Sequence, residues 1–129
     1  MRRYLCVACG ATVTVAPRGV LRRRLYGAQP IALAFVLFGV ERRSAELVRR
    51  AIAPTASPHA SAEGATWSTL RRWAQEAKAG TLPRQSRGCP PSFSLRAAAA
   101  RVAETLQGLG PRVAGLVERV WQGALEAPW

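Results

Sequence analysis

Two connectors rich in proline, glycine and serine divide this chain into short segments. Residues 53–65 read APTASPHASAEGA, and residues 81–93 read TLPRQSRGCPPSF. Proline lacks the backbone donor that helices and central strands need, and glycine has a high entropic cost in either element. The chain must therefore fold from short elements that pack together.

Outside the connectors, apolar residues recur mainly at helical spacing. The expected helices cover residues 30–39, 44–53, 66–80, 94–109 and 112–125. Ser44 and Ser94 can cap two of them, Thr66 or Ser68 can cap a third, and Gly80 can end it. The ten apolar residues of IALAFVLFGV, residues 31–40, are too few to span a bilayer, which takes about 20, so we expect a buried helix there.

The apolar faces of these helices predict the core. The residues expected to be buried are Leu47, Val48, Ala51, Ile52, Leu70, Trp73, Ala74, Ala77, Val102, Leu106, Leu109, Val113, Leu116, Val117, Val120 and Leu125. The role of Trp67 stays open between packing and stacking on a base.

The first 17 residues differ from the rest, because they favour strands. RRYLC and ATVTV are rich in β-branched and aromatic residues and flank a Cys-x-x-Cys-Gly turn, which predicts a β-hairpin. The expected fold is mainly α with a small N-terminal β-hairpin (half a zinc ribbon), helix-turn-helix-like helices and a C-terminal helical hairpin. Its parts are residues 1–28 (hairpin and basic connector), 29–80 (helix-turn-helix-like DNA-binding region), 81–93 (Pro/Gly linker) and 94–129 (helical hairpin).

Positive charge is concentrated in two blocks of the sequence. The net charge is +12, and 18 of the 19 basic residues are arginine. Residues 1–50 carry +8 and residues 66–101 carry +6, whereas residues 51–65 and 102–129 carry −1 each. Basic blocks of this kind point to a polyanion, most plausibly nucleic acid, because a solvated surface usually intersperses both signs.

The acidic residues exclude several enzyme classes. All seven are glutamate, and the sequence contains no aspartate. Two-metal nucleases generally hold magnesium with aspartate, and a Ser-His-Asp triad cannot be written. The one histidine, His59, lies in a connector, and no glycine-rich phosphate loop is present. We therefore expect a protein that is not an enzyme and has no small-molecule substrate.

Cys6 and Cys9 have the spacing that lets two thiolates bind one zinc ion. A complete ribbon needs a second pair about 15–20 residues away, and the sequence has none. Cys89 and His59, both in connectors, are weak candidates for the other two ligands. We therefore expect no cofactor, with zinc only if the missing ligands are supplied. Two small buried cysteines in a hairpin are the simpler interpretation.

The helices expected over residues 44–53 and 66–80 can be interpreted as a helix-turn-helix. The second would enter the major groove with Ser68, Thr69, Arg71, Arg72 and Gln75, which offer arginine to guanine, glutamine to adenine and hydroxyls to phosphate. Phosphate contacts are expected from Arg22, Arg23, Arg24, Arg42, Arg43, Arg49 and Arg50. The alternative is an amphipathic helix whose polar face is merely solvated.

The stretch RRYLCVACGATVTVAPRGVLRRRLYG, followed by two helices and STLRRWAQEAKAG, resembles the small zinc-ribbon plus helix-turn-helix proteins of bacterial transposable elements. The resemblance covers roughly residues 2–80. It implies sequence-specific or end-specific DNA binding for a transposase-like protein, with a structural zinc. The upstream Cys-x-x-Cys of that family is absent, so we expect an N-terminally truncated copy or a start site placed too late.

The expected function is therefore binding of duplex DNA by a transposase-associated protein, located in the cytoplasm with the nucleoid. The C-terminal helices would serve packing or formation of a homodimer, and no membrane is expected as a partner. The alternatives are a non-catalytic helical interaction or structural protein, and an RNA-binding protein, although the sequence lacks an aromatic RNA-recognition pattern.

Overall fold

The computed structural model describes residues 2–15, 21, 26–54, 67–84, 86–112 and 114–129. Its elements are β1 (Arg2–Leu5), β2 (Thr12–Val15), α1 (Ala28–Phe35), the π-helix η1 (Val36–Val40), α2 (Ala45–Ile52), α3 (Ser68–Ala79), α4 (Leu95–Leu109) and α5 (Leu116–Glu126). The predicted class, mainly α with a small β element, is confirmed.

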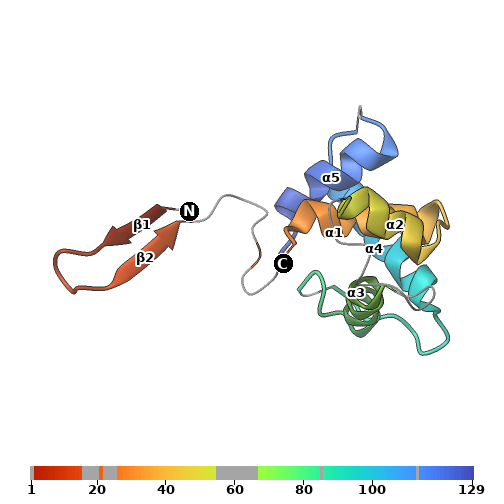
Figure 1. Cartoon of the computed structure of the whole chain (residues 1–129), viewed down its shortest axis with the longest axis horizontal. Helices are drawn as coiled ribbons and strands as arrows, with labels where there is room; N and C mark the ends of the chain where they lie inside the picture. Colours follow the sequence, from red (N-terminus) through yellow and green to blue (C-terminus); the bar gives the residue numbers. More distant parts are fainter. Residues whose placement is uncertain (1, 16–20, 22–25, 55–66, 85, 113) are drawn as a thin grey trace.

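Strands β1 and β2 form an antiparallel hairpin that extends away from the helices (Figure 1). Arg2 lies opposite Val15, and Leu5 lies opposite Thr12. The Cys6 amide donates to the Ala11 carbonyl at 2.8 Å, which closes the turn between the strands. The predicted hairpin is thus present, and it lies outside the helical core.

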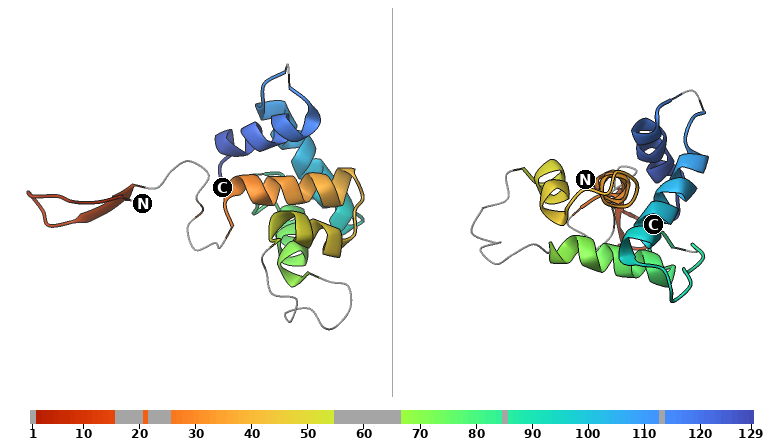
Figure 2. Two further views of the ribbon diagram at one scale, coloured as in Figure 1. Left: turned by 45° about the horizontal axis from the view of Figure 1, so that its top comes forward. Right: turned by 90° about the vertical axis from the view of Figure 1, so that its right-hand side faces the viewer.

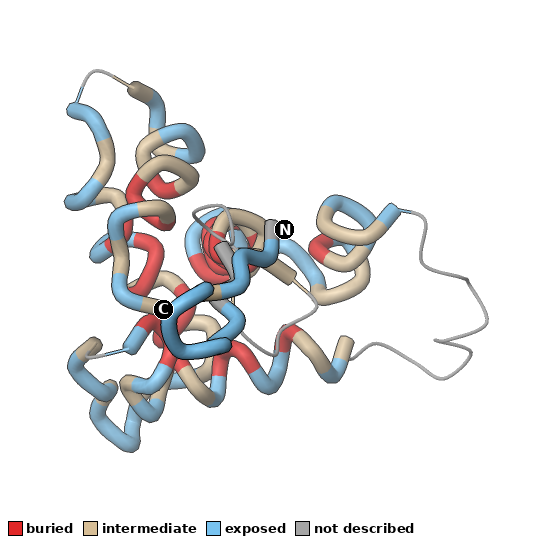
Figure 3. Tube along the Cα trace, turned by 90° about the vertical axis from the view of Figure 1, so that its left-hand side faces the viewer, coloured by how far each residue is buried: buried red, intermediate tan, exposed pale blue. Residues whose placement is uncertain are grey.

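The helix formed by α1 and η1 occupies the centre of the helical body. Figure 2 (right) shows α1 end-on, with the other helices around it. Ile31 and Phe35 have no exposed surface, and Figure 3 shows buried residues gathered where the helices meet. A segment that is apolar on every side is stable only when it is covered on every side. The expectation of a buried helix is therefore confirmed for residues 31–39, whereas Val40 at its end is 39% exposed.

This central helix ends in a π turn where it meets α4. A Cβ atom on Gly39 would overlap the Ala100 backbone nitrogen, so the absence of a side chain permits the contact. The chain then turns through Arg42, whose φ of 57° is left-handed, and the Arg43 amide donates to the Leu37 carbonyl at 2.9 Å. The C-terminal end of the helix is thus closed by its own backbone.

Helix α4 contacts η1, α3 and α5, and with α5 it forms the predicted C-terminal helical hairpin. Gly123 of α5 packs directly on the Leu106 backbone. Four residues expected in the core are instead exposed: Ala51, Leu47 by 49%, Leu109 by 48% and Val117 by 42%. Val113, also expected there, lies outside the described residues. The buried residues of α5 are Val120, Gly123 and Ala124. The close contact at Gly123 thus determines which side of α5 packs against the core.

Serine caps two of the helices as predicted. Ser44 accepts a hydrogen bond from the Leu47 amide, and Ser94 accepts one from the Ala97 amide. Ser68 does not cap α3, because the N-cap residue is Trp67, whose side chain makes no capping hydrogen bond, and Thr66, the other expected cap, lies outside the described residues. Gly80 ends α3 with a left-handed φ of 77°, as predicted.

Candidate nucleic-acid interface

Helix α3 has one buried side and one exposed side. Leu70 and Trp73 are 1% and 2% exposed, and Ala74 and Ala77 are also buried. The exposed side carries Ser68, Arg71, Arg72 and Gln75, with Thr69 half-buried at its edge. Residues 68, 71, 72 and 75 fall on one side of a helix because of its 3.6-residue period. The predicted contact residues of α3 are therefore brought together.

Three aromatic rings hold the N-terminal half of α3. Trp67 and Trp73 meet edge to face with ring centroids 5.4 Å apart, and Tyr26 lies 6.0 Å and 5.3 Å from them. This geometry is the favoured one for aromatic pairs. Trp73 is in the core as predicted, and Trp67 is engaged in packing. The aromatic contacts fix the part of the helix that presents Arg71 and Arg72.

The principal packing partner of α3 is α4, whereas α2 lies against α1 and η1. The connection between α2 and α3 runs through residues 55–66, which lie outside the described residues. Direct packing of α2 on α3, which a helix-turn-helix requires, is not what holds α3 in place. The helix-turn-helix pairing is therefore not confirmed.

The arginines of α2 are joined to a carboxylate. Glu46 accepts hydrogen bonds from Arg49 at 2.9 and 3.0 Å and from Arg50 at 3.0 Å. These bonds, that of Arg49 first, lower the pKa of Glu46 to about 2, and the same contact raises the pKa of Arg49. The Arg49 side chain is only 14% exposed. Much of the charge expected to meet phosphate on α2 is thus already compensated.

Replacing Glu46 with glutamine should destabilise the fold near neutral pH. The lowered pKa means that the ion pair stabilises the fold above the ordinary carboxyl pKa of 4.5, and that this stabilisation is lost as the pH falls through about 2. The difference in urea midpoint between wild type and Glu46→Gln should therefore shrink on acidification. Glu104→Gln, at an exposed position of α4, is the control. A difference that does not depend on pH would contradict the ion-pair account.

The remaining arginines predicted to contact phosphate have different surroundings. Arg42 is exposed beyond the end of η1, and Arg43 is ion-paired with Glu41 at 2.7 Å. Arg22, Arg23 and Arg24 lie outside the described residues.

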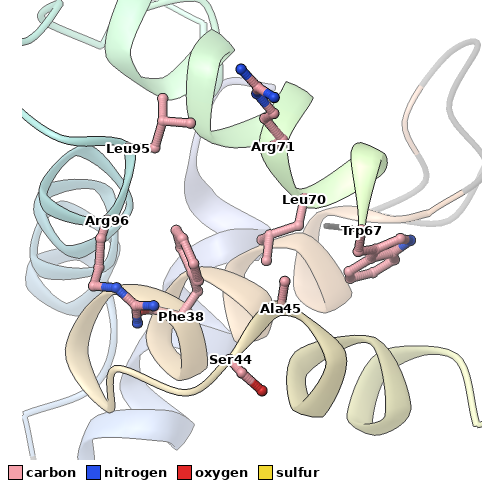
Figure 4. A pocket seen from close by; sticks show the side chains of 8 residues that line it. All are labelled: Phe38, Ser44, Ala45, Trp67, Leu70, Arg71, Leu95 and Arg96. Carbon is pink, nitrogen blue, oxygen red and sulfur yellow. The ribbon is translucent and has the colours of Figure 1, made fainter. Parts of the chain in front are cut away.

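A pocket of about 440 Å³ opens beside the exposed side of α3. Figure 4 shows Phe38, Leu70 and Leu95 turned toward this space, with Arg96 against Phe38. The other residues that line it are Ser44, Ala45, Trp67 and Arg71. Among the described residues that line this pocket, most are apolar, two are arginines and none is a carboxylate.

Arg96 has a structural role that the sequence did not indicate. Its Nη1 donates to the carbonyls of Phe38 and Arg43, and its guanidinium lies 4.3 Å from the centroid of the Phe38 ring. It thereby joins the start of α4 to the end of η1. No local pattern could reveal this contact, because its partners are 53 and 58 residues away in sequence.

Basic residues near the other end of α3 were assigned no function from the sequence. Arg84 and Arg87 are exposed in the connector over residues 81–93. Arg87 and Arg101 line a second pocket of about 300 Å³ with Ser86, Cys89 and Thr105. The signal that could have found them is the +6 charge of residues 66–101, which extends beyond α3.

The two hairpin cysteines lie at the turn between β1 and β2. Cys6 is half-buried and Cys9 is exposed. Hydrogen bonds from the Cys9 backbone, the Cys9 side chain and the Ala8 backbone lower the pKa of Cys6. Among the described residues, no group of three metal-binding side chains forms. Cys89 lies instead in the pocket beside α4, and His59 is outside the described residues.

Two further observations bear on the kind of protein this is. Within the described part of the chain, no helix combines the length and the apolar character needed to cross a membrane. The chain matches no protein-family model, and neither a curated protein nor a solved structure matches it.

Proposed function

We propose that the protein binds duplex DNA through the exposed side of α3. The observation that carries the proposal is the arrangement of Arg71, Arg72 and Gln75 on one side of a helix whose other side is buried. On α2, in contrast, Arg49 and Arg50 are both held by Glu46.

The residue types on this side suit the major groove, which admits a helix. Arginine binds the O6 and N7 atoms of guanine in a bidentate way, and glutamine does the same with N6 and N7 of adenine. Ser68 and Thr69 at the start of α3 can donate to phosphate. The N-cap residue Trp67 makes no capping hydrogen bond with its side chain, and the first turn of α3 holds no acidic residue, so its first amides also favour an anion there.

Phosphate contacts would come from exposed arginines away from α3. Arg42, Arg84 and Arg87 are exposed, and the chain as a whole carries +12. Such contacts position a protein on DNA and make its affinity fall with salt, but they carry no sequence information.

We extend the proposal to the role that the sequence resemblance implies, recognition of DNA by a transposase-like protein of a mobile element. That role requires tighter binding to one duplex sequence than to others. Selection of bound duplexes from a random pool should then enrich a defined sequence, and Gln75→Ala should relax the preference at one position. Recovery of a random pool unchanged would contradict this extension while leaving general DNA binding intact.

Fluorescence anisotropy with labelled duplex should show binding that weakens steeply as salt is raised. Replacing Arg72 with alanine should cost about 1–3 kcal/mol of binding free energy, because a base contact or a phosphate contact is lost. Arg112→Ala is the matched control: it removes the same charge from an exposed position between α4 and α5.

Three outcomes would contradict the proposal. The first is the absence of duplex binding at low salt. The second is an equal loss in Arg72→Ala and Arg112→Ala, which would mean that only total charge matters. The third is tighter binding of single-stranded RNA than of duplex DNA, which would favour an RNA-binding protein instead.

A further inference from the structure

The turn of the β-hairpin has the backbone of a metal-binding knuckle. Gly10 takes a left-handed φ of 69°, and its amide donates to the Cys6 carbonyl at 2.8 Å. Cys6 and Cys9 therefore lie within one tight turn, and a Cys-x-x-Cys turn of this kind can direct two thiolates at one zinc ion.

The hairpin supplies only half of such a site. Structural zinc is almost always held by four ligands in a tetrahedral arrangement. Cys6 and Cys9 provide two, and no third ligand joins them among the described residues. Cys89 lies elsewhere, in the pocket that includes Arg101 and Thr105. Within the described chain, the residues therefore do not fit a closed zinc site.

The surroundings of the two thiols suit a second protein surface. Val7, between them in sequence, is 101% exposed, and Leu5 is 69% exposed. Apolar side chains beside a polar turn are more stable when covered. The hairpin also extends beyond the helices, so that its tip is accessible to another molecule (Figure 1).

We propose that two copies of this chain share one zinc ion through Cys6 and Cys9 of each hairpin. Four thiols would each release a proton to solvent, and four thiolates with Zn²⁺ form a centre of net charge −2. Arg3, exposed on β1 of each copy, would offset that charge. Val7 and Leu5 of the two copies would cover one another around the metal. This inference does not rest on DNA binding and is tested without nucleic acid.

The test uses the full chain, reduced and freed of metal by a chelator, and titrated with zinc chloride. Light scattering after size exclusion should show the mass rise from that of one 13.9 kDa chain to that of two, with one zinc bound per two chains. Cobalt in place of zinc should give the visible absorption of a tetrahedral tetrathiolate. Cys6→Ser and Cys9→Ser should abolish both changes, and Cys89→Ser should alter neither.

Circular dichroism of each variant checks that the helices remain folded. Val7→Glu provides a variant with both thiols present, and it should weaken the dimer because carboxylates would face the thiolate centre. One zinc per monomeric chain would overturn the proposal and indicate that His59 or Cys89 completes the site. No zinc binding, zinc binding that survives Cys6→Ser, or a dimer that forms without zinc would overturn it as well.

Discussion

Replacing Trp73 with alanine should lower the free energy of unfolding by about 3–5 kcal/mol, as is usual for a large aromatic residue in a core. Trp73 is 2% exposed and meets the rings of Tyr26 and Trp67 at centroid distances of 5.3 and 5.4 Å. The substitution would leave a cavity on the buried side of α3. A loss of this size is a large part of the stability of a domain, which is about 5–15 kcal/mol.

Urea unfolding followed by circular dichroism measures this loss without depending on tryptophan fluorescence. Trp67→Ala is the matched control, because Trp67 belongs to the same aromatic cluster but is only partly buried. Its cost should be clearly smaller. Equal costs for the two variants, or a negligible cost for Trp73→Ala, would mean that α3 is not held on the core by the side chain of Trp73.

Adding a methyl group at Gly123 should destabilise the protein by about 1–3 kcal/mol or more. A Cβ atom there would overlap the Leu106 carbonyl oxygen, which belongs to the backbone of α4. A backbone atom cannot rotate away as a side chain can. Helix α5 would therefore have to shift, and the packing of Val120 and Ala124 would loosen with it.

Gly108→Ala is the control for this prediction. Gly108 lies within α4 and is exposed, and a Cβ atom there would meet no atom within 4 Å. Because glycine is a poor helix former, this change should stabilise the protein by up to about 1 kcal/mol. Thermal or urea unfolding of the two variants should give shifts of opposite sign. Shifts of the same sign would contradict the close approach of α4 and α5.

Local patterns in the sequence predicted α3 well. Leu70, Trp73 and Ala77 recur at helical spacing, and Gly80 is a residue that readily ends a helix. The structure begins the helix at Ser68 and ends it at Ala79. Ser44 and Ser94 were likewise identifiable as caps, because capping involves residues that are neighbours in the chain.

Packing between distant segments could not be predicted in this way. Hydrophobic spacing placed Val117 and Leu109 in the core, but the contact between α4 and α5 is made through Gly123, which a search for apolar side chains overlooks. The π turn of η1 depends in the same way on Gly39 meeting Ala100. Both contacts are determined by how closely two backbones approach.

The candidate interface was predicted in part. The exposed side of α3 follows from helical period and residue type, so its five proposed contact residues could be chosen from the sequence. The pairing of Glu46 with Arg49 and Arg50 was also readable, because spacings of three and four residues favour ion pairs on a helix. The net charge of a block of sequence does not reveal this pairing. Arg96 could not have been found, because its partners are defined only by the tertiary fold.

During synthesis, the apolar helix of α1 and η1 emerges from the ribosome well before the helices that cover it. Ile31 and Phe35 are fully buried in the finished fold, yet α4 and α5 follow them by some 60 residues or more. A growing chain that has completed α3 therefore still exposes a continuous apolar surface to water. Such a surface favours aggregation or capture by a chaperone until the remaining helices arrive. The yield of folded protein in the cell should thus depend on how quickly the last third of the chain is made.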